Sequence, residues 1–95
     1  IIFIVNMNKD TYQEKINPLS HLNVGTGMEL MISELANLIK KIVGFKGKVI
    51  FDETKLDGSP RKLIDASKLM SMGWKHETSL EEGLLKTYNW YLNNL

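Results

Sequence analysis

The clearest hydrophobic pattern in the chain lies just before Gly44. Apolar residues recur there at spacings of three and four, which places them on one face of a helix. These residues are Ile32, Leu35, Leu38, Ile39 and Ile42. Gly is a residue type that commonly ends helices, and Gly44 follows the last apolar position. The pattern therefore predicts an amphipathic helix that ends at Gly44.

A second long helix is predicted at the end of the chain, beginning after Ser79. Glu82 lies three residues after Ser79, the capping-box spacing in which each side chain accepts a hydrogen bond from the other residue's backbone N–H. An apolar stripe then continues at helical spacing through Leu80, Leu84, Tyr88, Tyr91 and Leu92. We expect the aromatic group of Tyr88, Trp90 and Tyr91 to pack in a core rather than to stack on a ligand.

The remaining elements are shorter. Residues 1–7 are apolar and fit either a strand or the end of a buried helix, of which we favour the tail of a helix. Residues 8–20 are interpreted as a polar connecting loop that contains Pro18, and residues 67–72 as a short helix closed by Gly73. Residues 21–24 and 48–51 are predicted to be strands, the second because it is rich in β-branched residues. Helices and strands in this order predict an α/β fold with a small sheet.

A glycine turn, Gly25-Thr26-Gly27, follows the first predicted strand and admits two interpretations. Backbone N–H groups of such a turn can bind a phosphate at a helix N-terminus. The dinucleotide fingerprint, however, needs a third glycine three residues later, and that position is Leu30. We therefore favour a structural turn in which glycine supplies a positive φ.

Composition narrows the classes of partner. Twelve basic and eleven acidic residues leave a net charge of +1, which provides no broad field for nucleic acid or an anionic membrane. The absence of cysteine excludes disulfides and thiolate metal sites and fits a reducing cytoplasm. His21 and His76 lack metal-ligand spacing, so no metal site is predicted. The apolar run at residues 1–5 is too short to span a membrane, and we expect a soluble, cytoplasmic protein.

The densest polar cluster is residues 55–62, KLDGSPRK. Arg61 can grip a diphosphate through a bidentate fork, Lys55 and Lys62 can act as point charges, and Asp57 can accept hydrogen bonds from sugar hydroxyls. The Asp-Gly and Ser-Pro pairs are also strong turn signals. A solvated surface turn therefore remains an alternative to a binding loop.

Several of these motifs together resemble one known family. HLNVGTG at 21–27, IVGFKG at 42–47, DGSPRK at 57–62 and the segment 69–74 occur in the order found in the C-terminal part of the GDP-L-fucose synthase family. That family belongs to the extended short-chain dehydrogenases/reductases. The resemblance runs from about residue 21 to residue 92. Two positions depart from the family pattern: Leu56 replaces a usual proline, and Met31 replaces a usual Ser or Thr helix cap.

The resemblance implies a fold and a division of roles. Members combine an N-terminal Rossmann domain, which binds NADPH and carries the catalytic residues, with a smaller α/β domain that closes over the GDP-sugar. Residues 1–95 are expected to form that substrate-binding domain, as a fragment of a longer two-domain enzyme; Ile1 rather than Met at the start is consistent with a fragment. No catalytic, cofactor-binding or metal-binding residue is expected here. The resemblance assigns diphosphate contacts to Lys55, Arg61 and Lys62 and a hydroxyl contact to Asp57.

The implied activity of the parent protein is NADPH-dependent epimerisation and reduction of GDP-4-keto-6-deoxy-D-mannose to GDP-L-fucose, by a homodimer. The isolated chain is expected to be inactive. Two alternatives remain open: a related epimerase, reductase or dehydratase acting on another nucleotide sugar, and a non-catalytic α/β binding or interaction module.

Overall fold

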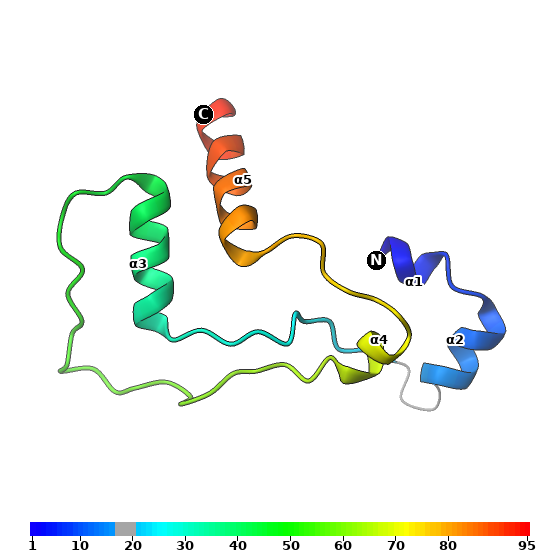
Figure 1. Ribbon diagram of the computed structural model, residues 1–95. Helices are drawn as coiled ribbons and strands as arrows, with labels where there is room; N and C mark the ends of the chain where they lie inside the picture. The colour runs from blue at the N-terminus through cyan, green and yellow to red at the C-terminus, as the bar shows by residue number, and fades with distance from the viewer. Residues whose placement is uncertain (17–20) are drawn as a thin grey trace. The chain divides into compact units, whose positions relative to one another are not determined.

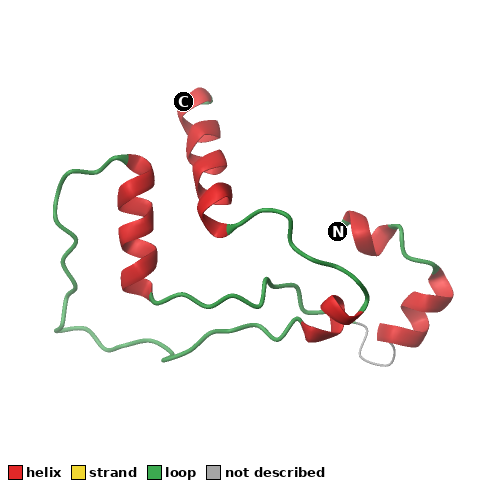
Figure 2. Ribbon diagram, viewed as in Figure 1, coloured by secondary structure: helices red, strands yellow, loops and turns green. Residues whose placement is uncertain are grey.

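The computed structural model describes residues 1–16 and 21–95, and the regular structure of this part is helical (Figures 1 and 2). The helices are α1 (Ile2–Val5), α2 (Lys9–Ile16), α3 (Ile32–Val43), α4 (Ser67–Ser71) and α5 (Leu80–Asn93). The chain divides into two compact units. The first unit comprises Ile1–Met28 and Leu63–Lys75, and the second comprises Glu29–Lys62 and His76–Leu95.

In the second unit, α3 and α5 lie side by side (Figure 1). The predicted helix before Gly44 is confirmed, and Gly44 ends it in the left-handed conformation at φ 70°. The half-buried apolar side chains of the pair are Leu35, Ala36, Leu38, Ile42 and Val43 of α3 together with Leu84 and Tyr88 of α5. No side chain of either helix is fully buried. The pair therefore shares a narrow, partly exposed seam.

The N-terminus of α3 begins without a capping oxygen, because Met31 occupies the cap position. Glu34 compensates for this loss in part: its Oε2 accepts a hydrogen bond of 2.8 Å from the Met31 backbone N–H. This contact is one half of a capping box. The helix start is thus held by Glu34, although the residue type usual at the cap is missing.

The predicted start of α5 is confirmed, because the Ser79 hydroxyl accepts a hydrogen bond of 3.2 Å from the Glu82 N–H. The expectation that the aromatic group packs is wrong for two of its members. Tyr88 is half-buried, whereas Trp90 is 67% exposed and Tyr91 is also exposed. At 3.6 residues per turn, Trp90 points to the side of the helix opposite Tyr88. A single neighbouring helix cannot cover both sides.

The first unit contains the buried side chains of the described residues, Ala66 just before α4 and Leu69 within it. The predicted short helix with Gly73 after it is confirmed, and Gly73 has φ 93°. Asp65 holds the start of α4 by accepting a hydrogen bond of 3.0 Å from the Ser67 N–H. The side chain and backbone of Ser67 lower the pKa of the Asp65 carboxyl.

Near the N-terminus, the helical interpretation of residues 1–7 is confirmed by α1, but the loop predicted for residues 8–20 is wrong over α2. Asn8 starts that helix: its side-chain oxygen accepts from the Asp10 N–H at 2.8 Å, and its carbonyl accepts from the Tyr12 N–H at 2.9 Å. Because α2 is polar nearly all round, it carries no apolar period for sequence reasoning to detect. Pro18 lies outside the described residues.

The two predicted strands are absent: residues 21–24 and 48–51 have no regular structure. A strand exists through backbone hydrogen bonds to a partner strand, and none of the backbone bonds among residues 1–16 and 21–95 pairs either segment. The β-branched residues of 48–51 favour extended backbone, but this local preference does not form a strand without a partner strand. The α/β class consequently stays a prediction, and the described part of the chain is helical.

A candidate substrate-binding loop

The loop that follows residue 51 in the second unit begins with a turn organised by Asp52. One carboxylate oxygen of Asp52 accepts hydrogen bonds from the Thr54 backbone N–H at 3.0 Å and the Thr54 hydroxyl at 2.6 Å. The Asp52 carbonyl accepts from the Lys55 N–H at 3.3 Å. The Thr54 hydroxyl, followed by the Thr54 N–H, lowers the pKa of the Asp52 carboxyl. Local hydrogen bonding therefore sets the backbone that leads into Lys55.

Arg61, near the end of the loop, is held by a residue distant in sequence. Its Nε lies 2.7 Å from Oε1 of Glu29, with the Arg61 side chain 68% exposed and that of Glu29 40% exposed. The hydrogen bond and the charge of Glu29 raise the pKa of Arg61. Sequence reasoning missed Glu29, because a single acidic residue after a glycine turn is not a distinctive signal.

The other predicted site residues, Lys55, Asp57 and Lys62, are exposed. Within the described residues, their side chains make no hydrogen bond or ion pair, and no interaction joins the four site residues to one another. All four lie on one open loop, which ends close to Glu29. Among the described residues, two of its three cations, Lys55 and Lys62, therefore have no carboxylate partner that would compete with a bound anion.

The glycine turn of the first unit has the structural role that we favoured. Gly27 adopts φ 74°, and a Cβ placed on it would lie 3.1 Å from the end of Met70. A Cβ on Gly25 would lie 3.3 Å from the Cβ of Ile64. Helix α3 begins only at Ile32, so the turn is not at a helix N-terminus, as a phosphate site of that kind requires. The glycines permit a sharp turn and close packing.

Comparison with known proteins supplies the context for this loop. No protein-family model matches the chain. A GDP-L-fucose synthase of Escherichia coli (strain K12) is 50% identical to it over 94 residues, which are 98% of this chain and 29% of that protein. The chain is homologous to the C-terminal part of GDP-L-fucose synthases. The family resemblance carried by the motifs is confirmed, and the chain spans less than a third of that relative's length.

Solved structures agree with the homology to GDP-L-fucose synthases. A GDP-6-OMe-4-keto-L-xylo-heptose reductase from Campylobacter jejuni is 35% identical, with a TM-score of 0.76 over 88% of this chain and 25% of that chain. A GDP-mannoheptose C4 reductase from Campylobacter jejuni with NADP bound is 39% identical, with a TM-score of 0.69 over 84% of this chain and 24% of that chain. The chain is thus similar, in sequence and in fold, to about a quarter of each of these two reductases.

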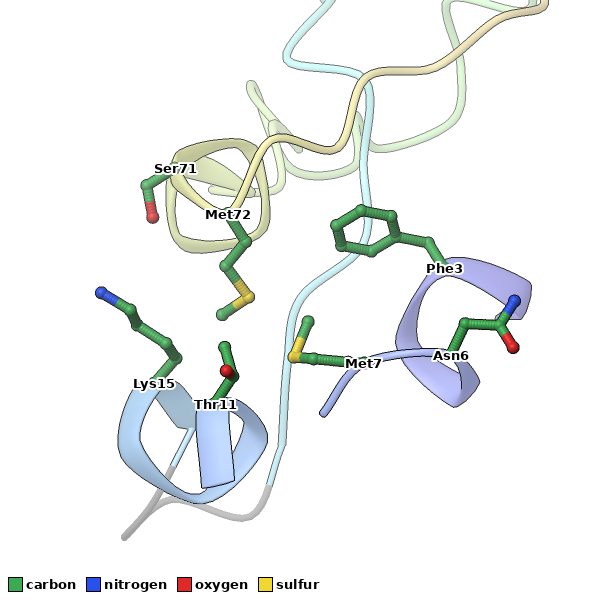
Figure 3. A pocket seen from close by; sticks show the side chains of 7 residues that line it. All are labelled: Phe3, Asn6, Met7, Thr11, Lys15, Ser71 and Met72. Carbon is green, nitrogen blue, oxygen red and sulfur yellow. The ribbon is translucent and has the colours of Figure 1, made fainter. Parts of the chain in front are cut away.

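A pocket in the first unit is a second place where this GDP-L-fucose synthase homologue could hold a ligand (Figure 3). It has a volume of about 530 Å³ and is lined by Phe3, Asn6, Met7, Thr11, Lys15, Ser71 and Met72. Lys15 is the only charged side chain among the described residues that line it, and the Ser71 hydroxyl already donates to the Lys68 carbonyl at 2.6 Å. The pocket has neither paired acid and base groups nor more than one cation, so the loop is the better candidate for a nucleotide diphosphate.

Two further findings concern metals and membranes. Among residues 1–16 and 21–95, no group of three or more His, Cys, Asp or Glu side chains could hold a metal ion. In the same described segments, no helix has both the length and the apolar character needed to cross a membrane. His21 is exposed, whereas His76 is half-buried.

Proposed function

We propose that the chain is the GDP-sugar-binding C-terminal part of an NADPH-dependent enzyme that converts GDP-4-keto-6-deoxy-D-mannose to GDP-L-fucose. The 50% identity to a GDP-L-fucose synthase supports the reaction, and the NADP-bound structural neighbour supports the cofactor. In this proposal residues 1–95 belong to a small α/β substrate domain. The observation in this chain that carries the proposal is the exposed loop at 55–62, whose Lys55 and Lys62 have no ion-pair partner among the described residues.

The binding chemistry follows from the residue types of the loop. The Arg61 guanidinium supplies directed N–H donors for phosphate oxygens, while Lys55 and Lys62 supply charge on flexible stems. Asp57 supplies an acceptor for sugar hydroxyls. The cofactor supplies the hydride for reduction, and in this proposal it is bound by the part of the protein outside this chain.

The proposal predicts that substitution of the loop cations weakens substrate binding. In the intact protein, Arg61→Ala and Lys62→Ala should each raise KM for the GDP-sugar about tenfold, because each removes a charge-assisted contact of about 1.5 kcal/mol. Steady-state kinetics with NADPH oxidation as the readout measure this. Lys46→Ala, an exposed lysine elsewhere in the second unit, is the matched control and should leave KM unchanged. Unchanged KM in both loop variants would support the surface-turn alternative.

The proposal assigns no catalytic group to this chain. A purified polypeptide of residues 1–95 should therefore show no NADPH-dependent reduction of a GDP-4-keto sugar, and measurable turnover would contradict the assignment. The family resemblance also predicts a homodimeric parent in the cytoplasm. Light scattering on the intact protein checks the first of these predictions, and fractionation checks the second.

A second candidate function is reduction of a GDP-heptose, and it is favoured by the names of the two structural neighbours. The diphosphate contacts would be the same in both cases, since both substrates carry GDP. A comparison of kcat/KM for GDP-4-keto-6-deoxy-D-mannose and for a GDP-4-keto-heptose separates the two candidates. A chain that binds GDP but belongs to a protein without turnover on either substrate would instead be a non-catalytic module.

A further inference from the structure

The ion pair between Glu29 and Arg61 joins the segment before α3 to the loop, across 32 positions of sequence. We propose that Glu29 is a positioning residue, which holds the Arg61 guanidinium so that its two terminal nitrogens face the diphosphate of the bound GDP-sugar. This inference rests on the proposed function, because it names how one side chain of the loop is prepared for that ligand.

The geometry of the contact leaves the phosphate-binding edge of Arg61 available. A guanidinium carries five N–H donors, one on Nε and four on the two Nη atoms. The contact to Glu29 uses the Nε–H, and Arg61 is otherwise largely exposed. The fork formed by the two Nη atoms, which matches two oxygens of a phosphate, is therefore not occupied by Glu29.

Glu29 is close in sequence to the start of α3. It lies two residues before Met31, whose backbone N–H is bonded to Glu34 in the first turn of α3. An arginine side chain loses about 2 kcal/mol of rotamer entropy when it is fixed. Because Glu29 already restricts Arg61, part of this loss of rotamer entropy occurs before the ligand binds. Lys55 and Lys62 have no such contact among the described residues and would lose their rotamer entropy on binding.

Glu29 would have the opposite effect on ligand affinity if its carboxylate competed with the phosphate for Arg61. A carboxylate beside Arg61 neutralises part of its charge and repels a phosphate, so removing the charge would then strengthen binding. Positioning predicts weaker binding after Glu29→Gln, whereas competition predicts tighter binding. The direction of the change in Kd therefore decides between them.

The experiment measures Kd for GDP by calorimetry, and kcat and KM for the GDP-sugar, on the intact protein. Glu29→Gln should raise Kd and KM three- to tenfold with kcat unchanged, and Glu29→Asp, which keeps the charge, should restore most of the affinity. In the Arg61→Ala background, Glu29→Gln should have no further effect, because its action passes through Arg61. Glu77→Gln, an exposed acidic position in the same unit, is the matched control and should leave Kd unchanged.

Each other result overturns the inference in a recognisable way. Unchanged or tighter GDP binding in Glu29→Gln, with weaker binding in Arg61→Ala, refutes positioning and leaves the proposed function standing. Equal weakening by Glu29→Gln with and without Arg61 shows a merely structural role. If Arg61→Ala itself leaves Kd unchanged, the role of Arg61 in the proposed function fails together with the inference.

Discussion

The helix pair of α3 and α5 and the loop at 52–62 belong to the same unit, but they are held in different ways. Each helix end is closed by residues within a turn of it. At the end of α3, the Gly44 N–H donates to the Lys41 carbonyl at 3.3 Å and the Phe45 N–H donates to the Lys40 carbonyl at 3.0 Å, which together make a Schellman motif. The helices also share a half-buried seam. The two helices are thus stabilised both by hydrogen bonds at their own ends and by packing against each other.

The loop, by contrast, is held within the described residues by a local turn at Asp52 and by the distant contact between Arg61 and Glu29. Its remaining charges face solvent without partners among the described residues. In this unit, stability therefore depends mainly on the helix pair and ligand binding on the loop. Polar groups of the helices form hydrogen bonds at the helix ends, whereas charged side chains of the loop stay available for a ligand. Substitutions in the two regions should consequently change different observables.

The largest effect on stability is expected in the helix seam. Leu38→Asp places a charge at a half-buried position of α3 and should destabilise the intact protein by about 2 kcal/mol, from lost apolar burial and desolvation of the carboxylate. Urea denaturation followed by circular dichroism measures it. Leu56→Asp in the loop is the matched control, because Leu56 is 99% exposed, and it should change stability by less than about 0.5 kcal/mol. Equal losses in both variants would contradict the comparison.

A smaller loss is expected at a helix end. Ser79→Ala removes the oxygen that accepts from the Glu82 N–H and should cost about 1 kcal/mol. The same change at Ser59, on the exposed loop, should cost almost nothing. Denaturation midpoints of the two variants, measured at equal protein concentration, test the difference. A midpoint for Ser79→Ala no lower than that for Ser59→Ala would show that the cap adds nothing.

The smallest effect is expected in acid, at the turn that opens the loop. The pKa of Asp52 is lowered in the folded chain, so its hydrogen bonds to Thr54 contribute their full stability above the ordinary pKa of 3.8. That contribution is lost as the pH falls through the lowered value. Asp52→Asn should therefore flatten the fall of stability below pH 4. Urea denaturation at a series of acidic pH values measures the curves of the two proteins, and curves of equal steepness would contradict the prediction.

Sequence reasoning succeeded mainly for elements whose ends are fixed by residues nearby in sequence. The ends of α3, α4 and α5 were predictable because Gly44, Gly73 and Ser79 act within a turn of the helix that each one closes. Helix α2 was missed because its start at Asn8 and its polar surface carry no apolar period. The predicted strands failed because pairing depends on a partner that no local preference supplies.

The candidate site shows the same division. The residue types of KLDGSPRK and the family motifs were sufficient to select Lys55, Asp57, Arg61 and Lys62 and to predict homology to GDP-L-fucose synthases. Their roles in binding stay predictions, since no bound ligand tests them. The sequence by itself determined the helices of the second unit and the chemistry available on its loop, because both depend on residue type and short spacing. Only the tertiary structure decided that Glu29 holds Arg61, because an ion pair between residues 32 positions apart exists only where the folded chain brings them together.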